Sequence, residues 1–120
     1  MLSAKEIMEL AVKALDDLKA QKISVLKTED VTVLADYFVI CTAGSTTQVK
    51  SLTDEVEKRL ADAGEQSLRR EGYRSGGWVL VDFGCVVVHI FLEEMRDFYG
   101  LERLWSDAQP VDVTHLIQEN

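Results

Sequence analysis

The chain has 120 residues, with 13 Lys or Arg against 21 Asp or Glu, so its formal net charge is −8 at neutral pH. This length suits one domain with its own core, and the hydrophobic fraction of 47% is ordinary for a globular protein. Direct binding to nucleic-acid phosphates requires clustered basic residues, and the acidic balance argues against it. The charge is compatible with a basic protein partner, and equally with a role in solubility alone.

The sequence predicts a cytosolic protein that does not bind membranes. No basic stretch followed by an apolar one opens the chain, and no apolar run approaches the roughly 20 residues that a membrane span needs. Cys41 and Cys85 lie in apolar, strand-like runs with no CxxC motif and no Cys/His cluster. We therefore expect two buried, reduced thiols.

The first half of the chain predicts two helices and two strands. Ser3 and Glu6 have capping-box spacing before a run of helical period, which predicts a helix from about Ala4 to Gln21. Residues 23–28 predict a short strand, 29–36 an extended connection, and the continuous apolar run 37–42 a central strand. Ser45 and Gln48 repeat the capping-box spacing and start a second helix, which Gly64 ends.

The second half is richer in strands. Residues 67–71 predict a third strand, and the glycine-rich stretch 72–77 predicts a loop. Residues 93–99 and 101–105 predict two short helical turns separated by Gly100. The order of elements predicts a mixed β-sheet with flanking helices, in an α/β or α+β domain, of which we take α/β as the prediction. We expect a single domain over residues 1–106 and a partly disordered C-terminal tail over 107–120.

The segment between these parts, WVLVDFGCVVVHIF, predicts a β-hairpin, because apolar residues alternate on both sides of a glycine-containing turn. With the turn at Gly84 and Cys85, cross-strand pairs form two opposite faces. One face is wholly apolar and is expected in the core: Val79 with Ile90, Val81 with Val88, and Phe83 with Val86. The other, here called the mixed face, pairs Trp78 with Phe91, Leu80 with His89, and Asp82 with Val87. A slip of one residue in the turn would exchange the two faces.

The mixed face either lies under a helix or meets a partner. Tryptophan and tyrosine are enriched at binding hot spots but are equally at home in cores, so Trp78 and Trp105 allow both interpretations. Asp82 and His89 share the face and could form a hydrogen bond across the strands, as a structural or a functional pair. The basic run of Arg69, Arg70 and Arg74 is interpreted as a solvated strand edge.

Catalytic chemistry has one candidate, the Gly44-Ser45 pair between a strand and a helix. Helix N-termini bind phosphate, and nucleotidyltransferases use such a pair, followed by two metal-binding acids on a strand. Here the acids at that distance, Asp54 and Glu55, are adjacent on a helix and point about 100° apart. His89 and His115 form no zinc pattern, and no nucleophile elbow is present. We therefore predict no catalytic residue, cofactor or metal, and keep nucleotide binding at Gly44-Ser45 as the alternative.

Four passages together give the sequence a family resemblance from about Leu2 to Trp105. These are LADYFVICTAGSTTQV from residue 34, Glu71-Gly72, GWVLVDFG with VVVHIF over 77–91, and FYGLERLW from residue 98. In identity, order and spacing they resemble the ribosomal silencing factor family, also called Iojap-like proteins. Cys85 departs from the pattern, since similar sequences usually carry Asp after the turn glycine. This departure puts in doubt a role for a turn carboxylate in partner binding.

The resemblance implies a nucleotidyltransferase-like α/β fold without catalytic acids. It also implies a translational repressor that binds the large ribosomal subunit through its fourteenth protein. Bound there, such a factor sterically blocks joining of the small subunit, especially when nutrients are limiting. No direct reading of nucleic acid is expected.

On this basis the mixed face and the short helices are the expected docking surface. The predicted partner-binding residues are Trp78, Leu80, Asp82, His89, Tyr99, Leu101 and Trp105. Trp78 and Leu80 would supply apolar anchors, and Asp82 would pair with basic partner residues. His89 is the weakest member of the set, with orientation of Asp82 as its minimal role. A homodimer formed through the same face, away from the ribosome, is a further alternative.

Overall fold

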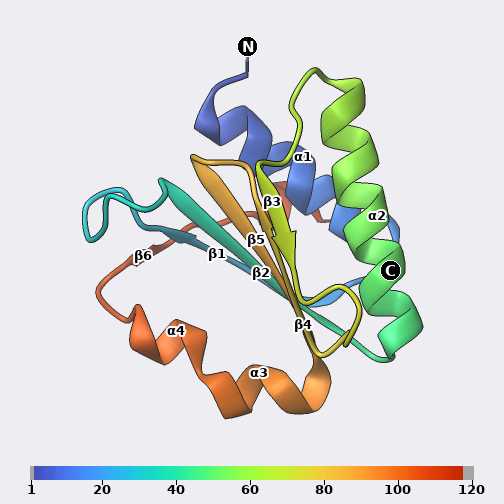
Figure 1. Cartoon of the computed structure of the whole chain (residues 1–120). Coiled ribbons are helices and arrows are strands. Elements are labelled where there is room, and N and C mark those ends of the chain that lie inside the picture. Colours follow the sequence, from blue (N-terminus) through green and yellow to red (C-terminus); the bar gives the residue numbers. More distant parts are fainter. Residues whose placement is uncertain (1, 118–120) are drawn as a thin grey trace.

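A six-stranded mixed β-sheet forms the centre of the computed structural model, which describes residues 2–117 (Figure 1). In chain order the strands are β1 (Gln21–Lys27), β2 (Tyr37–Ala43), β3 (Arg69–Glu71), β4 (Trp78–Asp82), β5 (Val86–Leu92) and β6 (Gln109–Pro110). The helices are α1 (Ala4–Asp17), α2 (Thr46–Asp62), α3 (Glu93–Tyr99) and α4 (Leu101–Leu104), with a 3-10 turn η1 (Thr114–Leu116). This architecture confirms the predicted α/β class with a mixed sheet and flanking helices.

The strand order is β3-β4-β5-β2-β1-β6, in which β2 and β5 pair in parallel and every other neighbouring pair is antiparallel. The parallel pair lies at the centre, and both strands are almost wholly buried, as their continuous apolar runs require. The short strand β3 is an edge, and its three residues are exposed, which confirms the interpretation of Arg69 and Arg70 as a solvated strand edge.

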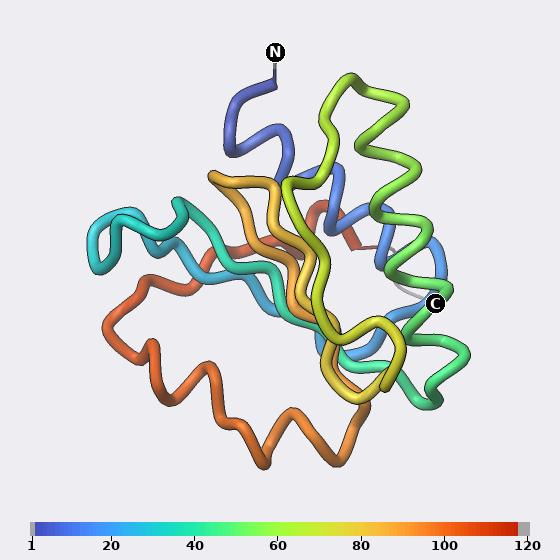
Figure 2. The backbone as a smooth tube through the Cα atoms, viewed as in Figure 1, coloured from blue at the N-terminus to red at the C-terminus, as the bar shows by residue number. Residues whose placement is uncertain are grey.

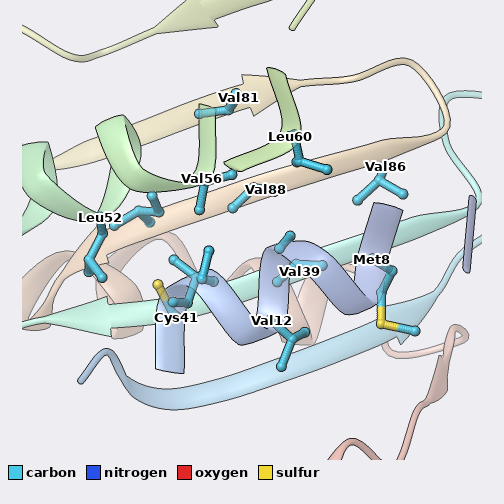
Figure 3. Packing of buried hydrophobic residues seen from close by; sticks show 14 of the residues in the cluster. Met8, Val12, Val39, Cys41, Leu52, Val56, Leu60, Val81, Val86 and Val88 are labelled. Atoms are coloured by element: carbon cyan, nitrogen blue, oxygen red, sulfur yellow. The ribbon is translucent and has the colours of Figure 1, made fainter. Parts of the chain in front are cut away.

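The main hydrophobic core lies between the sheet and helices α1 and α2, which cover the same side of it (Figures 1 and 3). Met8 and Val12 of α1, and Leu52, Val56 and Leu60 of α2, point toward the strands. The hairpin face predicted to be apolar contributes to this core. Its residues Val79, Val81, Val86, Val88 and Ile90 are fully buried.

The mixed face lies on the opposite side of the sheet, where α3 and α4 cover only part of it (Figure 1). A smaller buried cluster forms here: Leu26, Ala35, Phe38, Ile40, Val87, Phe91, Leu101 and Ala108. Trp78, Leu80, Met95 and Trp105 pack against it while remaining partly exposed. The sheet therefore has a thick core on one side and a thin, partly open aromatic layer on the other.

The observed register of β4 and β5 matches the predicted hairpin pair by pair. Trp78 pairs with Phe91, Leu80 with His89, and Asp82 with Val87, and the Phe83 amide donates to the Val86 carbonyl at 2.9 Å. Gly84 has a φ of 89°, which only glycine adopts readily. The turn therefore lies at Gly84, as the sequence predicts. The face assignment that depended on this turn is confirmed.

Helix α1 ends at Asp17, four residues before the predicted end at Gln21. The chain turns at Lys19, which has a φ of 64°, and the Ala20 amide donates to the Leu15 carbonyl at 3.0 Å. This is the C-terminal motif that glycine usually supplies. Because a lysine occupies the left-handed position, the sequence carried no stop signal here.

Helix α2 begins as predicted, but its capping box is only half formed. Ser45 Oγ accepts the Gln48 amide at 3.1 Å, whereas the Gln48 side chain accepts the Gly44 amide at 2.7 Å instead of that of Ser45. Gly64, with a φ of 93°, follows the helix as its expected stop. In α1 both halves of the Ser3 and Glu6 capping box are present.

The C-terminal segment returns along the edge of the sheet and passes to the side of α1 (Figures 1 and 2). Residues 109–110 pair with β1, and Ala108 and Val113 are buried against the two core layers. Partial disorder of the tail over 107–120 stays a prediction, and residues 118–120 lie outside the described part. Between residues 2 and 117, no helix combines the length and apolar character that crossing a bilayer requires.

Gly72 is predicted to be intolerant of a side chain. A Cβ at this position would lie 2.0 Å from the carbonyl oxygen of Trp78, and its φ is +83°. We expect Gly72→Ala to lower the free energy of unfolding by about 2 kcal/mol or more, measured by denaturant unfolding. Gly64→Ala is the matched control, because Gly64 has a φ of +93° but no atom within 4 Å of an added Cβ. Equal losses in the two variants would contradict the predicted clash.

Candidate functional site

Trp78 is the centre of an aromatic cluster on the mixed face. Its ring centroid lies 5.0 Å from that of Phe91, 4.6 Å from Tyr99 and 5.9 Å from His89. The ring is only partly buried, so one surface remains available to solvent or a partner. Strand β4 places Trp78 and α3 places Tyr99, so the cluster depends on how α3 sits against the sheet.

His89 is buried and only 4% exposed, and its predicted role in partner binding stays a prediction. Its Nδ1 atom accepts the indole N–H of Trp78 at 3.2 Å, and its ring packs edge-on against Phe38 at 5.0 Å. Nε2 is buried without an acceptor among the described residues. The hydrogen bond considered between Asp82 and His89 is not formed, because Trp78 binds one nitrogen of the ring and no residue in the described part of the chain binds the other.

Asp82 is held by the hairpin itself. One carboxylate oxygen accepts the Gly84 amide at 2.7 Å, which stabilises the turn. The other accepts Nε of Arg69 at 3.1 Å. A basic group of a partner would therefore have to compete with Arg69 for this carboxylate. Pairing of Asp82 with a partner stays a prediction.

The remaining predicted residues divide into surface and core. Leu80 and Trp105 are partly exposed and pack on the second cluster, and Trp105 meets Phe38 edge-on at 5.5 Å. Tyr99 is 48% exposed. Leu101 is only 9% exposed and belongs to the buried cluster itself. In the isolated protein it therefore packs beneath the exposed residues rather than forming part of the surface.

Four apolar side chains near this face were not predicted as site residues. Leu34, Phe98 and Leu104 are between 68% and 78% exposed. Leu34 lines a pocket with Leu80 and His89, and Phe98 packs edge-on against Tyr99. Leu68 is 73% exposed, and its side chain lies beside the hairpin turn at Gly84. Exposed leucines of this kind carry no signal in the sequence, because the pattern around them is that of an ordinary loop or helix.

Arg96 of α3 connects the aromatic layer to the sheet. Its guanidinium donates to the Lys22 carbonyl at 2.5 Å, to Thr42 Oγ1 at 2.9 Å, and to both carboxylate oxygens of Glu102. The side chain is 11% exposed. One residue therefore binds β1, β2 and α4 at once and fixes the position of Tyr99 beside Trp78.

The Gly44-Ser45 pair is closed by side chains of its own chain. The Gly44 amide, which a phosphate would need, donates to Gln48, and Ser45 Oγ accepts the Gln48 amide. Asp54 accepts the Tyr73 hydroxyl at 3.0 Å, and Glu55 pairs with Arg59 at 2.6 Å. Within residues 2–117, no group of three or more His, Cys, Asp or Glu side chains is arranged to hold a metal ion.

The two cysteines differ in environment. Cys41 is fully buried under the helices, and this burial raises the pKa of its thiol to about 12. Cys85 lies at the hairpin turn and is only partly buried, which corrects the expectation of two buried thiols. Both are free thiols. The turn position explains the difference, because a tight turn leaves one side of its residues in solvent.

The pH dependence of stability is predicted to report on His89. Burial lowers the pKa of its imidazole from 6.5 to about 4, and the nearby Asp82 carboxylate offsets part of this shift. Between these values the unfolded chain binds more protons than the folded one, so stability is complete above pH 6.5 and decreases as pH falls toward 4. The full loss corresponds to about 3 kcal/mol.

Denaturant unfolding between about pH 7 and pH 5 measures about 2 kcal/mol of this loss, in a window above the range where most carboxylates titrate. In His89→Phe the dependence on pH should be clearly flatter. An unchanged slope in that variant would show that other groups carry the acid sensitivity.

Comparison with known proteins places this arrangement in a family. The model of the family described as "Ribosomal silencing factor during starvation" matches residues 1–120. The ribosomal silencing factor RsfS of Halalkalibacterium halodurans is 40% identical over 97% of this chain and 99% of its own length. That of Bacillus subtilis is 39% identical over 93% and 95%.

Solved structures agree with the sequence relatives. A crystal structure of a Chromobacterium violaceum protein has a TM-score of 0.86 to this chain at 40% identity, covering 94% of each. The named relatives are silencing factors rather than enzymes. The full-length match and this level of identity show that the chain belongs to the ribosomal silencing factor family.

Proposed function

We propose that this protein represses translation by binding the large ribosomal subunit through its fourteenth protein and blocking access of the small subunit. The observation that carries the proposal is the partly open mixed face. Trp78, Tyr99 and Leu80 lie there without full cover, and Phe98 and Leu104 extend the apolar surface over α3 and α4. Aromatic residues in such a setting are characteristic of protein interfaces.

The charge of the chain supports a basic partner. The net charge is −8, and α3 carries the exposed acids Glu93, Glu94 and Asp97. Acidic groups around an apolar centre increase the association rate with a basic protein and make it depend on salt. Ribosomal proteins that contact RNA carry the complementary charge.

Co-sedimentation with separated large and small ribosomal subunits, at low and high salt, tests the proposal. We expect selective pelleting with the large subunit, weaker at high salt. A second assay follows joining of the two subunits, which the protein should inhibit when it is added before mixing. Failure to pellet with either subunit, from a folded sample, would refute the proposal.

The alternative activities have direct assays. The proposal includes a fold related to that of nucleotidyltransferases but without phosphate binding at Gly44-Ser45. The hydrogen bond from the Gly44 amide to the Gln48 side chain supports this, because that amide is already occupied. Nucleotide with magnesium should then leave the melting temperature unchanged, whereas a bound ligand in excess would raise it. Light scattering at several protein concentrations tests a homodimer formed through the mixed face.

A further inference from the structure

A small pocket opens on the mixed face next to His89. Its volume is about 150 Å³, and it is lined by Leu34, Phe38, Arg69, Leu80, Asp82, Val87 and His89. The apolar members come from β2, β4, β5 and the connection before β2, while Arg69 and Asp82 form an ion pair at 3.1 Å. The pocket therefore has apolar walls, one imidazole, and a charged pair that is already neutralised.

The imidazole of His89 presents an unused hydrogen-bond donor. Because Nδ1 accepts the Trp78 indole N–H, the neutral ring carries its proton on Nε2. Burial lowers the pKa of the ring to about 4, so the neutral form is present at neutral pH. Nε2 is buried, and no acceptor among residues 2–117 reaches it. A buried N–H without an acceptor is rare and costs stability.

The pairing of the strands places this donor on the pocket side of the ring. Trp78 pairs with Phe91 and lies diagonally from His89 toward one end of the hairpin, and it does not line the pocket. Val87 and Asp82 form the pair on the other side of His89, toward the turn, and both line the pocket. Because Nδ1 is directed to Trp78, the ring edge that carries Nε2 is turned away from Trp78, toward the end of the hairpin where these pocket residues lie.

We propose that docking of the ribosomal partner opens the pocket wall around the buried Nε2 atom of His89, so that one uncharged partner side chain, such as Thr or Asn, enters and its oxygen accepts a hydrogen bond from Nε2. The inference rests on the proposed function, because it specifies what the docked partner presents here. A lysine or arginine side chain has no acceptor to offer. A carboxylate would be placed close to Asp82 in an environment of low polarity, which opposes its charge.

This contact would make His89 a specificity residue rather than an anchor. Among residues 2–117 this donor has no acceptor, so the partner side chain would supply its hydrogen bond. A partner with an apolar side chain at this position would leave the donor buried and unpaired, and such a mismatch discriminates strongly between partners. Trp78, in contrast, would contribute through buried area on any apolar partner.

A comparison of His89→Phe with His89→Gln tests the proposal. Phenylalanine keeps a ring but has no donor, whereas glutamine reaches the Nε2 position with an N–H. Both remove the Nδ1 atom that accepts from Trp78, and the free energy of unfolding of each variant shows what that loss costs the fold. We expect His89→Phe to raise the Kd for the large subunit about 10-fold over wild type. His89→Gln should stay within about 3-fold, and at neutral pH His89→Phe should unfold no more easily than wild type.

The possible results distinguish a failure of the His89 contact from a failure of the proposed function. If the wild-type protein does not bind the large subunit, the proposed function is wrong. If it binds and both variants bind equally well, or are weakened by the same factor, the donor contact is overturned while the function stands. Should His89→Phe fail to fold, His89→Asn replaces it, because its oxygen can still accept from Trp78 and its nitrogen falls short of Nε2. Asn binding as well as Gln would likewise overturn the inference.

Discussion

Replacing Trp78 with alanine should weaken binding to the large ribosomal subunit by about 30-fold or more, which corresponds to about 2 kcal/mol. The indole lies at the centre of the mixed face, between Phe91, Tyr99 and His89, with part of its surface still open. A large, rigid side chain in this position buries further area when a partner docks. Truncation removes that area and also disturbs the packing of Tyr99.

The fold should survive this substitution. Trp78 is partly exposed and lies in the thin layer, while the main core under α1 and α2 does not include it. We expect the free energy of unfolding to fall by about 2 kcal/mol, which leaves a domain with a typical stability of about 5–15 kcal/mol folded. Circular dichroism and denaturant unfolding establish this before binding is measured by co-sedimentation.

Tyr73→Ala is the matched control for Trp78→Ala. Tyr73 is also an aromatic, partly buried residue, but it packs toward α2, where its hydroxyl donates to Asp54 and its ring lies under Arg70. Its removal should leave ribosome binding unchanged. Equal binding of a folded Trp78→Ala variant and wild type would show that the anchor lies elsewhere on the surface.

The sequence was sufficient for those parts of the fold that depend on strict local patterns. The hairpin register followed from the alternation of apolar residues on both sides of Gly84. A shift of one residue would have exchanged the two faces, so this pattern alone determined which side chains face the core. The buried run of β2 and the two short helices around Gly100 were predictable for the same reason. In each case the hydrophobic period or a glycine defines the element without help from distant residues.

Features that depend on contacts between distant segments could not be predicted. The short end of α1 relies on a left-handed Lys19, and the pairing of β6 with β1 joins residues far apart in the chain. At the site, the sequence placed His89 on the correct face but could not show that Trp78 would take its Nδ1 and Phe38 would cover it. Burial of a single residue on a mixed face depends on neighbouring strands.

Arg96 is the clearest example of a residue whose role only the structure shows, and its replacement should have the largest effect on the aromatic layer. In sequence it is one charge in a short polar helix. In the structure its buried guanidinium binds Lys22, Thr42 and Glu102, so three elements converge on it. Planar, fork-like donors make this arrangement specific to arginine.

Arg96→Ala should lower the free energy of unfolding by about 2–3 kcal/mol, because the Lys22 carbonyl, Thr42 and Glu102 lose their donor together. Binding to the large subunit should fall as well, since α3 would no longer hold Tyr99 against Trp78. Arg96→Lys keeps the charge but cannot reach all three partners, so it should lose most of the same stability. Arg103→Ala is the control, because Arg103 is exposed on α4 and donates to the Asp97 carbonyl at 3.2 Å.

The dependence on pH separates the ion pair from the rest of the Arg96 contacts. Hydrogen bonds from Arg96 lower the pKa of Glu102 below 4.5, so this pair stabilises the folded protein above that pH, and its contribution is lost as pH falls through the lowered pKa. The stability difference between wild type and Arg96→Ala should therefore narrow on acidification. What remains at low pH measures the bonds to Lys22 and Thr42. A difference that is the same at all pH values would show that Glu102 contributes nothing to holding α3 and α4 on the sheet.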